Sequence, residues 1–120
     1  MNMYDNNNML SLLEGFALTN PESVGRDLAA DFRKRRIEKN ITRKMMAEKS
    51  KVALATLTRF EQKGEISLHN LVRLAMALGY TSEIKSIFSQ PKFSTMEELD
   101  QINRNQGKKK AYDNRKSTRK

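Results

Sequence analysis

Apolar residues recur at helical spacing in the first half of the chain. Val24, Leu28 and Phe32 follow one another at intervals of four residues, and Ile37 later joins the same stripe. This spacing places the four side chains on one face of an α-helix, which is typical of a helix with one buried side. The pattern therefore predicts an amphipathic helix over residues 21–39.

The residues at both ends of this predicted helix favour the same boundaries. Asn20 is a good N-cap residue, and Pro21 suits the first helical position because its missing N–H would be unpaired there in any case. Asn40 tolerates the left-handed conformation that often ends a helix. We expect the chain to return to the core directly after Asn40.

Residues 41–61 are predicted to form two short helices joined by a tight turn. Met46 and Ala47 should face inward from the first helix, and Leu57 and Phe60 from the second. This is the arrangement of a helix-turn-helix, in which the second helix enters the major groove of DNA. An ordinary helical hairpin in another bundle is the alternative. The predicted turn consists of Ser50, Lys51 and Val52.

A further helix is expected between Ser67, as its N-cap, and Gly79, which should end it. Its apolar residues are spaced so that one face is buried against the preceding helices. The predicted inward positions are Leu68, Leu71, Leu74, Ala75 and Leu78.

The segments on either side of this domain differ from it in composition. Residues 1–20 form a flexible segment with an apolar patch at residues 9–18, which either docks on a partner or packs loosely on the domain. Residues 81–103 are predicted to hold a short helix capped by Ser82, an extended connector, and a last helix capped by Ser94 or Thr95. This extension either closes the core or forms a dimer or partner surface, made by Ile84, Ile87, Phe88, Phe93 and Leu99.

Charge is distributed unevenly along the chain, whose net charge is +9. Residues 24–80 carry 13 basic and 6 acidic side chains, and residues 104–120 carry 8 and 1. The segments before and between them are mildly acidic. Positive charge on the predicted domain and on the tail indicates a polyanion as partner. The polar, basic tail at residues 104–120 is predicted to be disordered.

Several classes of function find no support in the composition. The chain has no cysteine and one histidine, so no nucleophile with an adjacent base and no cluster of metal ligands is evident. No cofactor motif is present. We expect that the protein is not an enzyme and that it binds no cofactor. No apolar run approaches the ~18 residues of a membrane span. These features favour a cytoplasmic protein without membrane contact.

The order and content of the motifs are similar to one known family. The runs R-K-R-R-I-E-K-N-I-T-R, A-E-K-S-K-V, T-L-T-R-F-E and S-L-x-x-L-V-R-L-A-M-A-L-G resemble the Cro/phage-repressor (XRE) helix-turn-helix family over residues 24–80. The resemblance implies an all-α, compact bundle of four to five helices over residues 21–80, acting as a homodimer on double-stranded DNA. It also implies a bacterial, nucleoid-associated repressor that binds a palindromic operator and regulates its own operon.

A second, shorter resemblance concerns the C-terminal extension. The run I-F-x-x-P-x-F-x-x-x-x-E-L, followed by a basic tail, is similar to antitoxin repressors that accompany HipA-like kinase toxins. It implies a possible toxin protein as partner, so an antitoxin is the first alternative function. A non-specific nucleic-acid-binding protein driven by the basic tail is the second.

The resemblance assigns base reading to the second helix of the motif. Arg59 is the strongest single residue, because a guanidinium can bind guanine O6 and N7 together. Leu54 and Ala55 are apolar, so they can sense only thymine methyl groups or shape, which predicts thymines beneath this helix. The assigned base-reading positions are Ala53, Leu54, Ala55, Thr56 and Arg59.

Other positions are expected to contact the DNA backbone or to support the motif. Lys51 stands where the family favours glycine, so it is either strained or part of a different turn. Arg36 and Glu61 match a family pair that joins the first helix to the end of the recognition helix. The expected phosphate contacts are Thr42, Arg43, Lys44, Lys51, Thr58 and Lys63.

Overall fold

The computed structural model describes residues 19–112, and the chain within this range forms six α-helices and no strand. The all-α prediction is confirmed. The predicted apolar patch at residues 9–18 and the tail from residue 113 onward lie outside the described residues. The chain divides into two compact units, one ending at Ile84 and the other starting at Lys85.

Helix α2 (Pro21–Glu38) begins and ends where its terminal residues predict. The side chain of Asn20 accepts a hydrogen bond from the backbone N–H of Ser23 at 2.8 Å, and the Ser23 hydroxyl accepts one from the Asn20 N–H at 3.2 Å. This reciprocal capping box pairs N–H groups that the first turn leaves without partners. Asn40 follows the helix with φ +60°, the expected left-handed conformation.

The predicted buried face of α2 is right for Phe32 and wrong for the other three residues of the stripe. Val24 and Leu28 are 53% and 47% exposed, and Ile37 is also exposed. Ala29 and Arg36 are buried together with Phe32. Spacings of three and four residues place these three side chains on one face of the helix. Two of them are not large apolar residues, so the hydrophobic pattern of the sequence indicated the neighbouring face.

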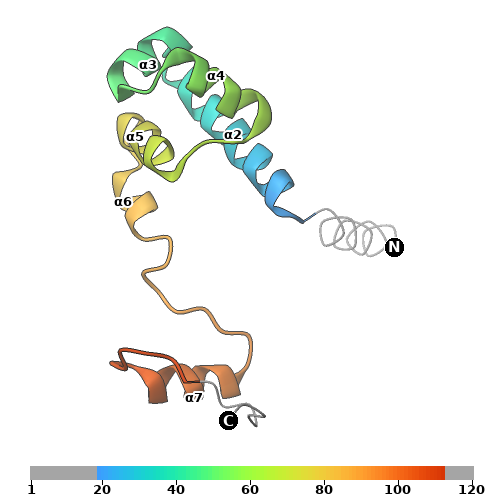
Figure 1. Cartoon of the computed structure of the whole chain (residues 1–120), viewed down its shortest axis with the longest axis vertical. Helices are drawn as coiled ribbons and strands as arrows, with labels where there is room; N and C mark the ends of the chain where they lie inside the picture. Colours follow the sequence, from blue (N-terminus) through green and yellow to red (C-terminus); the bar gives the residue numbers. More distant parts are fainter. Residues whose placement is uncertain (1–18, 113–120) are drawn as a thin grey trace, which may run out of the picture. The chain divides into compact units, whose positions relative to one another are not determined.

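Four helices of the first unit enclose its core (Figure 1). Helix α3 (Arg43–Ser50) contacts α4 (Leu54–Lys63) and α5 (Leu68–Leu78), and α4 also packs on α2. The rings of Phe32 and Phe60 meet edge to face with centroids 5.6 Å apart. The compact bundle is confirmed, and its buried apolar residues are Ala29, Phe32, Met46, Val52, Leu57, Phe60, Leu74 and Leu78.

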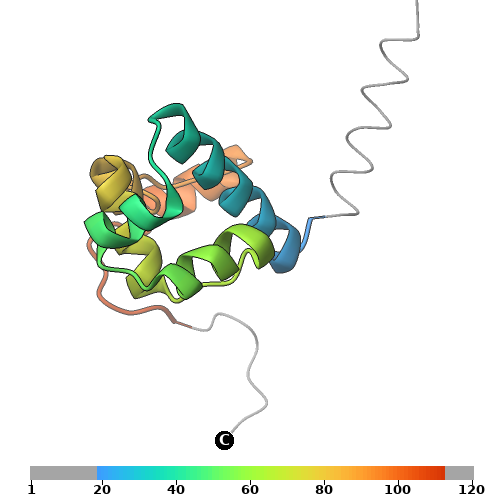
Figure 2. The same cartoon turned by 90° about the horizontal axis from the view of Figure 1, so that it is seen from above.

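Two glycines let α2 and α4 approach closely. Gly64 ends α4 with φ +75°, a conformation that favours glycine. A Cβ atom added to Gly25 would lie only 2.6 Å from the carbonyl oxygen of Gly64. Figure 2 shows the C-terminal end of α4 meeting the N-terminal half of α2. The orientation of α4 therefore depends on this backbone contact as well as on the core.

Helix α5 is capped as predicted. The Ser67 hydroxyl accepts from the Asn70 N–H at 3.2 Å, and Gly79 ends the helix with φ +91°. Leu74 and Leu78 are buried, but Leu68 is 72% exposed, so its predicted inward position is wrong. Leu68 is the first residue of the helix, and the contacts with the core begin one turn later.

The extension after α5 differs from its prediction at the first helix. Helix α6 (Thr81–Lys85) is only five residues long, so Ser82 lies inside it and is not its cap. Ile87 and Phe88 follow the helix, and Phe88 is 94% exposed. The predicted short helix is present, but it ends before Ile87 and Phe88, and none of its residues is buried in a core that would stabilise a further turn.

Helix α7 (Met96–Asn105) is capped by Thr95, whose hydroxyl accepts from the Glu98 N–H at 3.1 Å. Of the two predicted caps, Thr95 is therefore the one used. The helix includes the first two residues of the predicted tail, 104 and 105. Leu99 and Ile102 are partly buried in this unit, whereas Phe93 and Met96 are exposed.

Candidate nucleic-acid interface

The N-terminus of α3 presents unpaired backbone N–H groups next to basic side chains. Thr42 caps the helix by accepting from the Met45 N–H at 3.0 Å. Arg43 and Lys44 are the first two residues of the helix. The positive end of the helix dipole and these cations favour an anion at this position. The local structure therefore suits a phosphate group.

The turn between α3 and α4 passes through Lys51 in the left-handed conformation, with φ +62°. Its N–H donates to the Ala47 carbonyl at 2.9 Å, and its own carbonyl accepts from Arg73 Nη1 at 3.3 Å. The hydroxyl of buried Ser50 accepts from the Val52 N–H at 3.2 Å. These bonds hold the turn and offset the strain of a non-glycine residue, which is of order 1 kcal/mol.

The outer face of α4 carries the predicted base-reading residues. Ala53 precedes the helix and makes no side-chain cap. Leu54, Ala55 and Arg59 are exposed, whereas Thr56 is partly buried. The buried face of the helix is formed by other positions, so this outer face is available for contact with a partner.

Arg59 has a partner that the sequence did not suggest. Its Nη2 atom lies 2.7 Å from the Oε1 atom of Glu65, two residues after the end of α4. Both side chains are about three-fifths exposed, at 62% and 61%. An exposed pair of this kind contributes little to stability, ~0–1 kcal/mol. The pair places a carboxylate beside Arg59 and partly neutralises its charge.

A buried carboxylate joins α4 to the two helices before it. Glu61 has no exposed side-chain area, and its two oxygens accept from Arg36 Nε at 2.7 Å and Arg36 Nη2 at 2.9 Å. Arg43 Nε donates to the same carboxylate at 3.0 Å. Arg33 Nε lies 4.0 Å away. The remaining Arg36 Nη1 donates to the carbonyl of Ile41 at 2.8 Å, so this guanidinium is held at three points.

The electrostatic balance of this cluster keeps Glu61 ionised. Burial by itself would raise the pKa of Glu61, but the hydrogen bonds and charges of Arg36 and Arg43 outweigh it. The pKa therefore lies below the ordinary value of 4.5. One carboxylate balances only one of the three guanidinium charges around it, so the surface at this point stays positive.

An open groove of about 540 Å³ lies over this cluster, between α2, α3 and the start of α4. It combines cationic and hydroxyl groups with two apolar side chains, Ile37 and Leu54. Four predicted phosphate contacts line it, which are Thr42, Arg43, Lys44 and Thr58. The remaining lining residues are Arg33 and Arg36.

Comparison with protein families gives a match over part of the chain. Residues 32–84 match the family model described as helix-turn-helix. The match starts within α2 and ends at the residue that closes the first compact unit. These residues form a helix-turn-helix domain of the Cro/phage-repressor (XRE) family. A comparison with curated proteins and one with solved structures found no match.

The helix-turn-helix domain makes the protein a DNA-binding transcription regulator. Its family binds DNA and is not typically enzymatic. Within residues 19–112, no group of three or more His, Cys, Asp or Glu side chains could hold a metal ion. In the same range, no helix is both long and apolar enough to cross a membrane.

The predicted DNA-contact residues fall into two sets, those that line the groove and those that lie outside it. The groove set contains four phosphate candidates and Leu54. Lys51 and Lys63 are exposed outside the groove, as are Ala53, Ala55 and Arg59. Sequence reasoning missed Arg33, which faces the groove from α2, and Glu65. The spacing of Arg33, one turn before Arg36 on the same helix, could have indicated that both residues lie on the same side of α2.

Proposed function

We propose that the protein is a sequence-specific repressor that binds a palindromic operator as a homodimer and regulates its own operon. One observation carries this proposal. The exposed outer face of α4 adjoins a groove with several cationic and hydroxyl side chains, and the buried Glu61 cluster fixes α4 beside that groove. Sequence-specific binding needs this combination, because phosphate contacts set the register and a rigid helix reads the bases.

In this proposal Arg59 reads a guanine, and Leu54 and Ala55 contact thymine methyl groups. Ala53 and Thr56 complete the surface that faces the bases. The phosphate contacts come from two places. Thr42, Arg43, Lys44 and Thr58 act from the groove, and Lys51 and Lys63 act from outside it. The pair of Arg36 and Glu61 positions the recognition helix and does not itself read sequence.

The homodimer is proposed to form through the extension after α5. Exposed apolar side chains there, Ile87, Phe88 and Phe93, have no core of their own to join. Ile84 and Leu99 are partly buried and border them in the sequence. A dimer also matches the two-fold symmetry of a palindromic site, since each copy reads one half. We further propose that the protein acts in the bacterial cytoplasm, at the nucleoid.

The same exposed residues favour one other function. An antitoxin would use Phe88 and Phe93 to bind a toxin protein, which the resemblance to antitoxin repressors suggests is a HipA-like kinase. Co-purification with the product of a neighbouring gene distinguishes the antitoxin from a repressor without a protein partner. Loss of that product with the double change Phe88→Ser/Phe93→Ser, while operator binding persists, supports the antitoxin.

A titration tests the repressor proposal. The duplex upstream of the protein's own gene is compared with a scrambled duplex of equal length in ~150 mM salt, where exposed charges are strongly screened. We expect the native duplex to bind more tightly, and Arg59→Ala to lose most of that preference. Arg35→Ala is the matched control, because Arg35 is paired with Glu38 on α2 and does not line the groove. Equal affinity of the wild type for both duplexes would overturn the proposal.

A further inference from the structure

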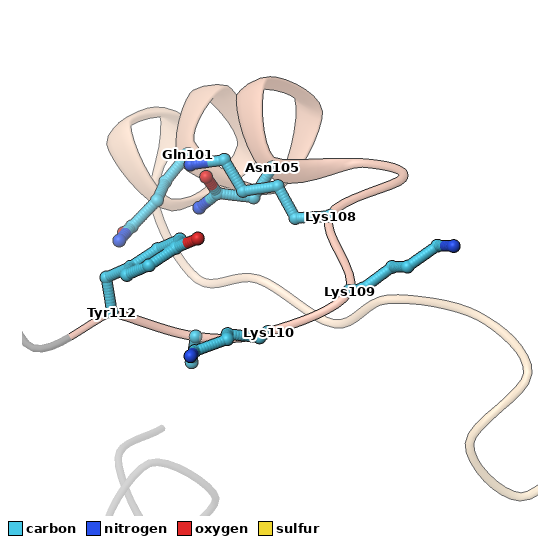
Figure 3. Close-up of a pocket in the computed structure, with 7 residues that line it drawn as sticks. Gln101, Asn105, Lys108, Lys109, Lys110 and Tyr112 are labelled. Atoms are coloured by element: carbon cyan, nitrogen blue, oxygen red, sulfur yellow. The ribbon is translucent and has the colours of Figure 1, made fainter.

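The C-terminal unit holds a pocket of its own, formed where the chain turns back after α7. Gly107 makes this turn with φ +84°. The following residues run back along the last turns of the helix, so that Tyr112 comes to lie near Gln101 and Asn105 (Figure 3). The pocket has a volume of about 470 Å³ and is lined by Gln101, Asn105, Lys108, Lys109, Lys110, Ala111 and Tyr112.

Positive charge is concentrated at this pocket. Residues 101–112 contain four basic side chains and no acidic one. The ammonium groups of Lys108 and Lys110 lie 6.0 and 5.9 Å from the centre of the Tyr112 ring. Lys109 points away from the ring in Figure 3. The two ammonium groups lie on opposite sides of the ring in Figure 3, so each can attract a phosphate near the ring.

The aromatic ring itself is accessible. Tyr112 is 68% exposed, although it lines the pocket. A ring in this position can stack on a planar group that enters from solvent. The amides of Gln101 and Asn105 border the same space, and each offers both donors and an acceptor. The pocket therefore combines groups that suit a phosphate, an aromatic face and a polar ring edge.

We propose that this pocket binds one nucleotide unit of a single-stranded nucleic acid. Lys108 and Lys110 bind the two phosphates that flank this unit in the strand, the base stacks on Tyr112, and Gln101 or Asn105 bonds the base edge. Proteins that bind single strands combine a positive surface with stacking aromatic side chains in this way. A duplex fits less well, because its bases are covered on both faces by their neighbours. The pocket volume lies within the roughly 300–1,000 Å³ of small-ligand sites.

This inference goes beyond operator binding and does not depend on it. The pocket lies entirely in the unit that starts at Lys85, whereas the family match ends at Ile84. Its residues are therefore different from those proposed to read the operator, and each site can fail alone.

The test measures binding of the full chain to a fluorescent oligothymidine of about 15 nucleotides between ~50 and 200 mM salt. The pocket double variant is Lys108→Gln/Lys110→Gln. The charge-matched control is Lys49→Gln/Lys85→Gln, which removes the same charge from residues that do not line the pocket. We expect the pocket variant to lose about tenfold more affinity than the control, and its salt slope to fall by about 1.4, or 0.7 for each phosphate contact.

Two variants of Tyr112 test whether a base stacks on its ring. Tyr112→Ala should weaken binding by about tenfold, and Tyr112→Phe should restore it, because phenylalanine keeps the ring. The same variants should keep the wild-type preference for operator duplex. Oligonucleotide binding that follows the pocket, in a protein without operator preference, would reject the repressor proposal and leave this one intact.

Three results would overturn the inference. One is an equal loss of affinity in the pocket variant and its control, which would indicate a general charge effect. Another is unchanged binding by Tyr112→Ala. The third is competition by a poly-glutamate peptide as effective as that by oligothymidine of equal charge, because the pocket would then recognise acidic peptides.

Discussion

Arg36 on α2 binds both carboxylate oxygens of Glu61 on α4, at 2.7 and 2.9 Å, and the carboxylate is fully buried. The two residues are 25 positions apart in the sequence. The pair therefore sets how the recognition helix lies against the first helix. Because Arg43 adds a bond at 3.0 Å, one carboxylate links three helices.

Removal of this carboxylate should destabilise the domain strongly. Glu61→Gln leaves Arg36 buried without a counter-charge, and breaking a buried pair in this way costs ~3–5 kcal/mol. Urea unfolding followed by circular dichroism measures the loss. Glu38→Gln is the control, since the exposed pair of Arg35 and Glu38 should contribute only ~0–1 kcal/mol. Similar stability of both variants would show that the buried pair does not hold the fold.

The same carboxylate should make stability depend on pH in the acid range. The pKa of Glu61 is lower in the folded state than its ordinary value of 4.5. The unfolded chain therefore takes up a proton first as the pH falls, which favours unfolding. The stabilising contribution is complete above pH 4.5 and is lost as the pH falls through the folded-state pKa. Urea titrations from pH 7 downward should show a steeper loss for the wild type than for Glu61→Gln.

Gly25→Ala should destabilise the protein even though alanine is the better helix former. Helix propensity alone would stabilise the variant by about 1 kcal/mol. The new Cβ atom would instead lie 2.6 Å from the Gly64 carbonyl oxygen, and relieving such a clash typically costs ~1–3 kcal/mol. Thermal unfolding shows which effect is larger. A raised melting temperature would mean that α2 and α4 can separate without loss.

Glu65→Gln should strengthen DNA binding and reduce its selectivity. The change frees Arg59 from its partner at 2.7 Å and removes a negative charge beside the proposed DNA face. We expect tighter binding to scrambled duplex and a salt slope steeper by about 0.9, as for one more phosphate contact. Glu48→Gln, at another exposed acid, controls for net charge. An unchanged preference for operator over scrambled duplex would show that Glu65 does not restrain Arg59.

The elements set by local chemistry were predictable from the sequence. Asn20, Thr42, Ser67 and Thr95 act as caps because a short polar side chain bonds a backbone N–H two or three residues away, which depends on nearby residues alone. The left-handed residues after α2 and α5 follow from the same local preferences. Helix boundaries in the helix-turn-helix domain were therefore predicted well.

The features set by distant contacts were not predictable in this way. The buried face of α2 contains Arg36, and only the family resemblance, which pairs it with Glu61, pointed to this residue. The contact of Gly25 with the Gly64 backbone had no signal in the sequence. Neither residue carries a hydrophobic signal. The bond between Arg59 and Glu65 crosses the end of a helix, where regular spacing rules no longer apply. The arginine cluster at the groove likewise needs three helices in place.

Selection from a library of random duplexes tests most directly whether α4 reads a DNA sequence. Wild-type protein should enrich an inverted repeat with thymines in each half-site, and Arg59→Ala should lose preference at one symmetric pair of guanines. Enrichment of a single unrepeated site would contradict the proposed dimer but not the reading of sequence by α4. If no sequence is enriched over the starting library, the helix-turn-helix domain does not select a sequence and the repressor account is wrong.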